Sequence, residues 1–542
     1  MRNYKWRYFS VLCIGLAFIL RIFRVGEYPV SLYIDEVAIG YNAHSIVETG
    51  RDEWGIPFPT YFRSFDDYKL PLYIYLVAAS ELVVGKTPLA VRLPSVLAGT
   101  ATVLVVLMLF PSLGVKKKTT LIAGLLLATL PWHIHFSRGG FEATLGLFLT
   151  TWGILLLVKH VVESVIPAKA TSDVAKAGIQ VIKMNGSRIK CGMTEYLLPF
   201  LLLVLSLYSY HSQRIITPLL VLVVLIIYRR SLTRQVLRRF LLPSFLCFIL
   251  LIPYLLYTFS PQGLARASSE TFLADVRVRP DNLFSQKPIL AAEHFLRGYV
   301  SNFSPITLFF TGDGNGRHGV REIGQLYLWQ LPLLLLGVIH TLRHSREGGN
   351  PRNFNLLMLF WLLLAPLPAA LVRPNPHALR TLPMIIPISY FIAAGLQRSL
   401  AMITQAKSEY RISNLIVLIL FLLPISYFLL SYLHIYYIHY PRRTEPDWNG
   451  GQKETVEYIL SKKKDYKEVW ITRDFVEGYI FFAYYGDILA QLENIVFLPT
   501  KYPLSYEKGI LFLAPSGSFA PGKLLTTIHD KSNNPIFDLW EL

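Results

Sequence analysis

Long runs of apolar residues, separated by short polar segments, follow one another along most of the chain. A membrane core of ~30 Å needs roughly 20 apolar residues in each helix that crosses it. Eleven runs come near that length and predict membrane-spanning helices: 8–25, 88–111, 119–136, 141–160, 196–211, 215–228, 240–259, 326–342, 354–372, 381–397 and 412–434. A further run, 69–85, is shorter and contains Glu81.

The basic residues predict the orientation of these helices. If the N-terminus is cytoplasmic and 69–85 does not cross, every cluster of Lys and Arg, such as Lys116–Lys118 and Arg229-Arg230, falls on the cytoplasmic side. We therefore expect 69–85 to lie at the outer interface or to re-enter it. The odd number of crossings then places the C-terminus outside. The first run has a basic N-terminal flank and no small-x-small cleavage site, which favours an uncleaved first span.

Three segments are expected in outer water, namely 26–87, 260–325 and 435–542. The last of these alternates helix-like stretches (451–464 and 475–484) with strand-like runs (467–472, 494–499, 509–515 and 536–542). The sequence therefore predicts two domains: an all-α polytopic membrane module over 1–434 and a small α/β domain over 435–542. The inner loops 161–195 and 344–351 are interpreted as inserted surface loops without chemistry.

Composition narrows the class of protein. Hydrophobic residues make up 53% of the chain and charged residues 16%, against about 25% charged in soluble domains. This excludes a cytosolic enzyme, a disordered chain and a fibrous protein. The net charge of +18 lies mainly in short loops between apolar runs, so we expect no nucleic-acid partner. Cys13, Cys191 and Cys247 are too few for a disulfide framework and are expected to be unpaired.

The first candidate for chemistry is the acidic pair Asp35-Glu36, about ten residues after the first span. Near a low-dielectric boundary a carboxylate binds protons more tightly, which suits a general base. The structural alternative is that Asp35 caps the N-terminus of the amphipathic helix that follows it.

Basic groups also gather at the outer ends of several spans, against the positive-inside trend. They are Lys69; His133, His135 and Arg138, with Glu142; His211 and Arg214, with Tyr208 and Tyr210; and Arg373, His377 and Arg380. Such cations indicate a bound phosphate or, alternatively, contacts with lipid headgroups. A local pair between Arg138 and Glu142 at helical spacing is the alternative for those two residues.

The residues themselves predict no metal site. His133 and His135 are two apart and do not share a helix face, and neither an HExxH nor a CxxC pattern is present. The glycine-rich segment from Gly312 to His318 lacks the closing acid of a calcium loop, so we interpret it as a structural turn. Taken together, a carboxylate base facing cations at the outer leaflet is the chemistry of moving a group off a lipid phosphate.

The order of these motifs resembles a known family. Asp35-Glu36, Tyr68-Lys69-Leu70-Pro71, the Arg92-Leu93-Pro94-Ser95 run and Ser137-Arg138 with Glu142 follow one another over the first ~220 residues. This arrangement is similar to that of the bacterial relatives of the protein O-mannosyltransferases and the lipid A aminoarabinose transferases. These are polyprenyl-phosphate-sugar-dependent glycosyltransferases of the GT-C fold. The resemblance implies an outer active site and in-plane helices in the first loop.

The resemblance also implies roles for individual residues. Asp35 would be the catalytic base, with Glu36 beside it, and Glu142 would stand where the family normally has Asp. Lys69 and Arg214 would contact the carrier phosphate, together with Arg138, His211 and Arg380. The chain has Lys-Leu-Pro where many relatives have Lys-Pro or His-Pro-Pro. Some relatives use a divalent cation, which Asp35, Glu36 and Glu142 could hold.

The function expected from the sequence is therefore an inverting glycosyltransferase in the bacterial inner membrane. Its donor would be a polyprenyl-phosphate-linked sugar, and its acceptor a hydroxyl of a lipid, a glycan or a protein. A transporter or flippase of a lipid-linked sugar is the alternative, although few charges stand near the expected midplane and no internal repeat is visible. A scaffold that anchors the outer domain is a third interpretation, for which eleven spans are excessive.

Overall fold

The structure is a computed structural model that describes residues 2–65, 67–163, 194–261, 263, 271–272, 286–343, 352–405, 414–472, 475, 478–486, 494–498, 508–518, 520 and 522–542. Residues 164–193 of the predicted inserted loop 161–195, the whole loop 344–351, and residues 262, 264–270 and 273–285 of the segment 260–325 lie outside these residues. Cys191 does too, whereas Cys13 and Cys247 are buried free thiols, as expected.

Each of the eleven predicted spans is helical. They correspond to α1 (Arg2–Ile22), α4 (Pro88–Ser112), α5 and α6 (Lys117–Thr129 and Pro131–Phe136), α7 (Glu142–Glu163), α9 (Thr194–Leu207), α10 (Gln213–Ile227), α11 (Arg234–Thr258), α14 (Gln330–Arg343), α15 and α16 (Arg352–Leu364 and Leu367–Ala370), α17 (Ile385–Gln405) and α18 (Asn414–His434). Five stretches of the described chain are long and apolar enough to cross a membrane: Pro88–Ser112, Glu142–Glu163, Arg234–Thr258, Arg352–Ala370 and Leu382–Met402. The run at 69–85 is also helical, as α3 (Pro71–Val84).

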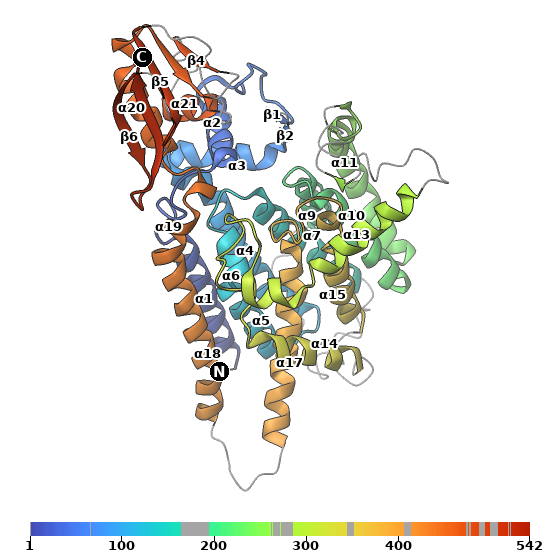
Figure 1. The fold of residues 1–542 in the computed structure, drawn as a ribbon. Helices are drawn as coiled ribbons and strands as arrows, with labels where there is room; N and C mark the ends of the chain where they lie inside the picture. The colour runs from blue at the N-terminus through green and yellow to red at the C-terminus, as the bar shows by residue number, and fades with distance from the viewer. Residues whose placement is uncertain are drawn as a thin grey trace. The chain divides into compact units, whose positions relative to one another are not determined.

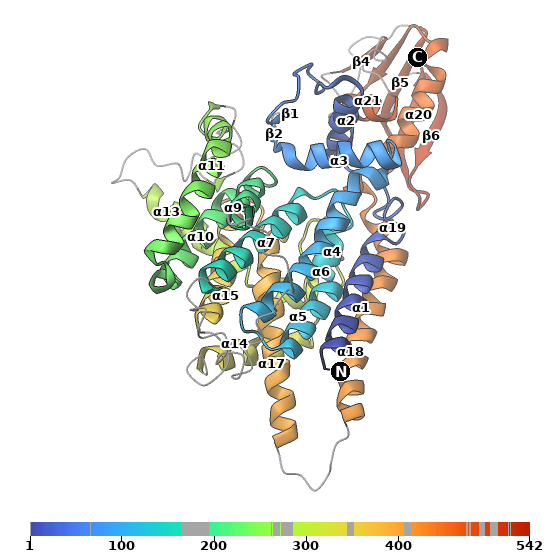
Figure 2. The same ribbon diagram turned by 180° about the vertical axis from the view of Figure 1, so that it is seen from behind.

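The chain divides into two compact units. The first consists of Met1–Phe23, Asp67–Tyr73 and Leu93–Leu433, and the second of Arg24–Asp66, Ile74–Arg92 and His434–Leu542. Most helices belong to the first unit, where α1 runs alongside α18 in both views (Figures 1 and 2). The predicted boundary between a membrane module and an outer domain, at 434–435, stays a prediction.

Two buried arginines in the first unit cap the C-terminal ends of helices. The Arg21 guanidinium, on α1, donates to the carbonyls of Leu127 (3.1 Å) and Ala128 (3.2 Å), in the last turn of α5. The Arg138 guanidinium donates in turn to the carbonyls of Leu20 (3.0 Å) and Arg21 (3.1 Å), in the last turn of α1. The last carbonyls of a helix lack intrahelical partners and carry partial negative charge. Both arginines therefore serve as charged C-terminal caps.

The second unit joins the loop that follows the first helix to the C-terminal region. From the first loop it contains α2 (Ile34–Thr49), β1 (Phe62–Ser64) and most of α3. From the C-terminal region it contains α19 (Tyr440–Thr444), α20 (Gln452–Lys462), α21 (Tyr479–Tyr485) and a five-stranded sheet of order β4-β3-β5-β7-β6. A small α/β arrangement is therefore confirmed for this region (Figure 1).

The sheet is mixed, and four of its five strands follow the predicted runs. The parallel strands are β3 (Glu468–Ile471), β4 (Ile495–Phe497) and β5 (Ile510–Pro515). The antiparallel strand β7 (Pro535–Glu541) pairs with β5 on one side and with β6 (Lys523–His529) on the other. The strand that the sequence analysis did not predict is β6. The core of the sheet is β5, whose residues Ile510 to Ala514 are fully buried. A continuous apolar run is typical of a strand that is covered on both faces.

Candidate functional site

Asp35 lies in the first turn of α2, in the second unit. The N-cap of this helix is Tyr33, two residues earlier, so the structural alternative of Asp35 as the N-cap is wrong. Asp35 is half-buried. A carboxylate in the first helical turn is stabilised by the free N–H groups and the positive end of the helix dipole. The role of Asp35 as a general base stays a prediction.

Glu36, its neighbour, is placed quite differently. Its carboxylate is fully buried and accepts two hydrogen bonds from the Arg92 guanidinium, from Nε at 2.9 Å and from Nη2 at 3.0 Å. It also accepts from the Tyr33 backbone N–H at 3.3 Å. Arg92 reaches this position from the start of α4 and donates as well to the carbonyls of Val25 and Pro29. Glu36 thus ties α2 to α4 and to the chain before α2, which is a structural task.

A cleft of about 1560 Å³ opens in the second unit, on another face of α2. Tyr41, His44 and Glu48 line it, three and four residues apart as one helix face requires, whereas Asp35 is not among its lining residues. Behind His44 lies Glu81 of α3, with 3.4 Å between His44 Nδ1 and the carboxylate. Burial raises the pKa of Glu81 to about 8, with the nearby charge of Lys86 opposing the shift and that of Glu48 adding to it.

Lys69 and Arg214, two predicted phosphate contacts, share one neighbourhood in the first unit. Lys69 is nearly buried, at 8% exposure, in the short strand β2 (Asp67–Lys69) before α3. The rings of Tyr68 and Tyr257 meet edge to face at 6.2 Å between centroids. The Arg214 guanidinium lies over the same Tyr257 ring, 5.4 Å from its centroid. Tyr257 thus contacts both Tyr68, the neighbour of Lys69, and Arg214. That Lys69 and Arg214 bind one phosphate stays a prediction.

The guanidinium of Arg214 is incompletely hydrogen-bonded. Arg214 stands at the start of α10 and also contacts the ring of Tyr254, at 5.4 Å. Its Nε and Nη2 atoms are buried and have no hydrogen-bond partner within the part of the chain that the structure describes. A buried donor without a partner costs about 1–3 kcal/mol, and more when it is charged. A bound anion would remove this cost.

The remaining predicted residues lie elsewhere in the first unit. Glu142 is the first residue of α7 and is half-buried. Because α6 ends at Phe136 and α7 begins at Glu142, Arg138 and Glu142 do not stand in one helix. His211 is in the turn before α10, and Arg380 is in the loop before α17; both are half-buried. Their contacts with a donor phosphate stay predictions.

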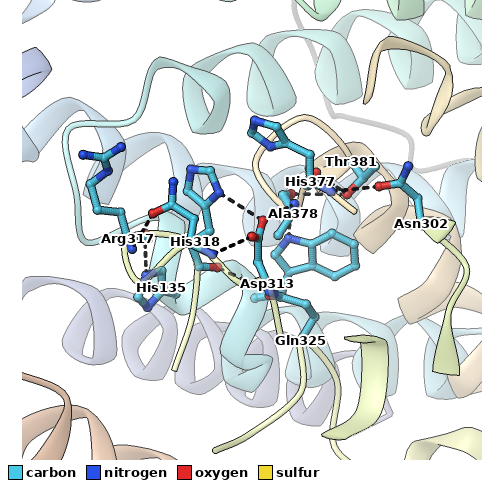
Figure 3. A network of polar contacts seen from close by, with 11 residues as sticks. His135, Asn302, Asp313, Arg317, His318, Gln325, His377, Ala378 and Thr381 are labelled. Atoms are coloured by element: carbon cyan, nitrogen blue, oxygen red, sulfur yellow. Dashed lines mark hydrogen bonds and ion pairs between the residues drawn. The ribbon is translucent and has the colours of Figure 1, made fainter. Parts of the chain in front are cut away.

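A buried polar network connects two loops of the first unit that the sequence analysis treated separately. Asp313 Oδ2 accepts from His318 Nδ1 at 3.0 Å and from the Ala378 backbone N–H at 2.8 Å (Figure 3). The imidazole rings of His318 and His377 lie 4.9 Å apart between centroids. One ligand atom from each of Asp313, His318 and His377 falls within 4.8 Å of the other two. The segment interpreted as a plain turn thus belongs to a cluster of metal-ligand type.

The protonation states of this cluster follow from its surroundings. Burial alone would raise the pKa of Asp313, but the hydrogen bond and charge of His318, with backbone N–H groups of Asn315 and Ala378, hold it below its usual range. Burial, together with the charges of His318 and Arg380, lowers the pKa of His377 well below its usual value. At neutral pH the carboxyl group is therefore ionised, and the His377 ring is neutral.

The fold is the GT-C fold, as the resemblance in the sequence implied. ArnT from Cupriavidus metallidurans superposes with a TM-score of 0.55 in the apo state, at 11% identity, over 99% of this chain and 98% of that one. ArnT bound to undecaprenyl phosphate gives a TM-score of 0.53, at 10% identity, over 98% and 97% of the two chains.

The oligosaccharyltransferase AglB from Archaeoglobus fulgidus has the same fold. Its complex with an inhibitory peptide and a dolichol-phosphate superposes with a TM-score of 0.52, at 13% identity, over 92% of this chain. The present chain spans 65% of the length of AglB. The sequence matches no protein-family model and no curated protein. At these identities the likeness shows the fold alone.

Proposed function

We propose that the chain is an inverting glycosyltransferase that uses a polyprenyl-phosphate-linked sugar at the outer face of a bacterial inner membrane. The observation that carries this proposal is the Arg214 guanidinium, with two buried donors that lack hydrogen-bond partners in the described chain, beside the Lys69 segment. An arginine donates to phosphate oxygens in pairs, and a lysine adds a point charge. The pair suits the phosphate of the lipid carrier.

The chemistry proposed for the other residues is the one that the sequence resemblance implies. Asp35 takes the proton of the acceptor hydroxyl as its oxygen attacks the anomeric carbon of the sugar. The bond between that carbon and the phosphate oxygen breaks, and the polyprenyl phosphate leaves with the electron pair. Because phosphate is a good leaving group, stabilisation of its charge by Lys69 and Arg214 contributes more than acid assistance would. Arg138, His211, Arg380 and Glu142 are assigned to the surroundings of the donor.

The solved structures of the same fold support this choice of donor. ArnT has been crystallised with undecaprenyl phosphate, and AglB with a dolichol-phosphate and a peptide. Both lipids are polyprenyl phosphates in the broad sense. Each of these two proteins of the same fold therefore binds a lipid phosphate of the kind that we propose for Arg214 and Lys69. The acceptor, which we expect to be a hydroxyl of a lipid, a glycan or a protein, is to be identified by comparing envelope material from cells with and without this chain by mass spectrometry.

Two substitutions test the proposal. Asp35→Asn keeps the shape of the side chain but removes the base, so transfer should fall by about 10²–10⁴-fold. Arg214→Lys keeps the charge but removes the paired donors, so the Kd for undecaprenyl phosphate should rise about tenfold or more, since hydrogen bonds to charged groups are worth ~1.5–3 kcal/mol. The matched control is Arg239→Lys, because Arg239 also stacks on an aromatic ring, that of Tyr196, but is exposed and donates to the hydroxyl of Tyr196.

The outcomes separate the roles of the two residues. A folded Asp35→Asn variant with wild-type transfer would remove Asp35 from the mechanism. Unchanged lipid affinity in Arg214→Lys, or an equal loss in Arg239→Lys, would show that the unpaired nitrogens of Arg214 do not serve the phosphate.

A further inference from the structure

Asp313, His318 and His377 come together from two loops that are distant in the sequence. Asp313 and His318 belong to the loop between the short helix at Thr307–Thr311 and α14, and His377 to the loop before α17. Figure 3 shows the three side chains around the point where the loops meet. Asp313 and His318 are buried, at 4% and 7% exposure. The sequence offers no local motif for this cluster, because its members are up to 64 positions apart.

The backbone of both loops is fixed by side-chain hydrogen bonds. The His377 backbone N–H donates to Asn302 Oδ1 at 3.0 Å, and Gln325 Nε2 donates to the His318 carbonyl at 3.3 Å. Asp313 Oδ1 accepts from the Asn315 N–H at 2.9 Å, which closes the turn. Groups that hold the ligands of a metal in place in this way raise its affinity. The cluster is thus built before any ligand arrives.

One nitrogen atom in the cluster is not used for hydrogen bonding. His377 Nδ1 is buried and has no hydrogen-bond partner among the residues described. Hydrogen bonding within a turn explains the contact between Asp313 and His318, but it does not explain why the half-buried imidazole of His377 places a buried nitrogen beside them without a hydrogen bond. A buried polar atom without a partner costs about 1–3 kcal/mol. A ligand for that nitrogen would account for its position.

We propose that Asp313, His318 and His377 bind a divalent transition-metal ion, with zinc preferred. Two imidazoles and a carboxylate are common ligands of zinc, and three protein ligands leave one position for water or substrate. Magnesium and calcium, which favour oxygen ligands, fit this set less well. Zinc–ligand bonds of ~2.0–2.1 Å put tetrahedral ligands about 3.3 Å apart. The side chains, now within 4.8 Å, close around the ion by small rotations.

The charge around the site sets its selectivity. Asp313 supplies one negative charge, whereas the positive charge of Arg380 acts on His377. With one negative charge on Asp313 and a positive charge on Arg380, the site attracts cations only weakly by charge. It therefore favours metal ions that bind imidazole nitrogen strongly over ions that depend on charge attraction alone. The site differs from the residues Asp35, Glu36 and Glu142 that the sequence resemblance offered for a cation. It stands independently of the proposed glycosyl transfer.

The test measures metal content in the full-length protein. The protein, purified in detergent with an affinity tag that contains no histidine, is incubated with zinc, dialysed against metal-free buffer and analysed by inductively coupled plasma mass spectrometry. The protein used as background should carry His434→Ala and His439→Ala. The Nε2 atoms of these two histidines lie 3.3 Å apart and could retain zinc adventitiously. We expect about one zinc per chain, and cobalt loaded instead should give the absorption bands of a low-coordinate site.

His377→Ala is the decisive variant, because its ring makes no hydrogen bond through Nδ1 on which folding could depend. The zinc content of His377→Ala after dialysis should be about one tenth of that of the background protein, or lower. The variant should still elute as a single folded species in gel filtration. The matched control is His294→Ala, which removes an exposed histidine of the same unit that contacts Arg373 and should retain zinc fully. No zinc or cobalt in the background protein, or equal zinc in His377→Ala, would overturn the proposal. Transfer activity is measured in parallel, so that loss of metal and loss of catalysis are scored separately.

Discussion

Glu36 and Asp35 are adjacent carboxylates with opposite surroundings, and substituting each in turn separates a structural role from a catalytic one. Glu36→Gln keeps the size of the side chain but leaves the Arg92 guanidinium buried without its counter-charge. Loss of one partner from a buried ion pair costs about 3–5 kcal/mol. Because the guanidinium keeps its bonds to the carbonyls of Val25 and Pro29, we expect the lower end, ~3 kcal/mol. Asp35→Asn, at a half-buried position, should change stability far less.

Hydrogen exchange measured by mass spectrometry suits this test, because it reports on α2 itself. A loss of ~3 kcal/mol corresponds to roughly 150-fold faster exchange of the protected amides of α2, at about tenfold for each 1.4 kcal/mol. Asp35→Asn is the matched control and should leave this exchange near the wild-type rate. The double variant Glu36→Gln/Arg92→Met should recover part of the loss, because it no longer buries an unpaired charge. Wild-type exchange in Glu36→Gln would refute the structural assignment of this residue.

Two further predictions concern the second unit. The raised pKa of Glu81, about 8 against an ordinary 4.5, means that the folded state binds a proton more tightly than the unfolded state, so stability should fall as the pH rises from about 4.5 to about 8. Glu81→Gln should flatten this dependence in thermal melts between pH 5 and 9, and an unchanged slope would contradict it. Asp538, buried on β7, accepts from the Gly517 N–H (2.9 Å) and the Thr527 hydroxyl (2.7 Å). Asp538→Ala should therefore destabilise the sheet by about 1–3 kcal/mol, measured as a lower melting temperature than that of a Thr526→Ala control.

The helices were predictable because membrane helices depend on a property that is local in sequence. A run of apolar residues must satisfy its backbone hydrogen bonds internally, whatever surrounds it, so each predicted span is helical. The strand at Lys523–His529 was missed for the opposite reason. Its residues are half-buried or exposed, and it pairs with β7 at the edge of the sheet. Neither an alternating pattern nor a buried run marks it.

The candidate site was predictable only in part. Sequence order placed Asp35 at the start of a helix and Lys69 before another, which the structure confirms. It could not distinguish Asp35 from Glu36, since the difference lies in Arg92, 56 residues further on. The same limit hid the cluster of Asp313, His318 and His377, whose members meet through folding of separate loops. Contacts between residues so far apart in the sequence are set by the tertiary structure. The spacing of residues along the chain does not predict them.

The capping of α5 by Arg21 and of α1 by Arg138 has a consequence for how the protein is inserted into the membrane. Until α5 is present, the Arg21 guanidinium can donate to the Ala17 carbonyl of its own helix but to none of the carbonyls of α5. An arginine with so few partners is costly in a hydrocarbon environment. The first helix must therefore wait near the lipid headgroups, or beside the insertion machinery, while later segments are synthesised. A nascent chain that stops before residue 117 should remain loosely held and be degraded quickly, whereas one that extends past Arg138 completes both caps and becomes resistant.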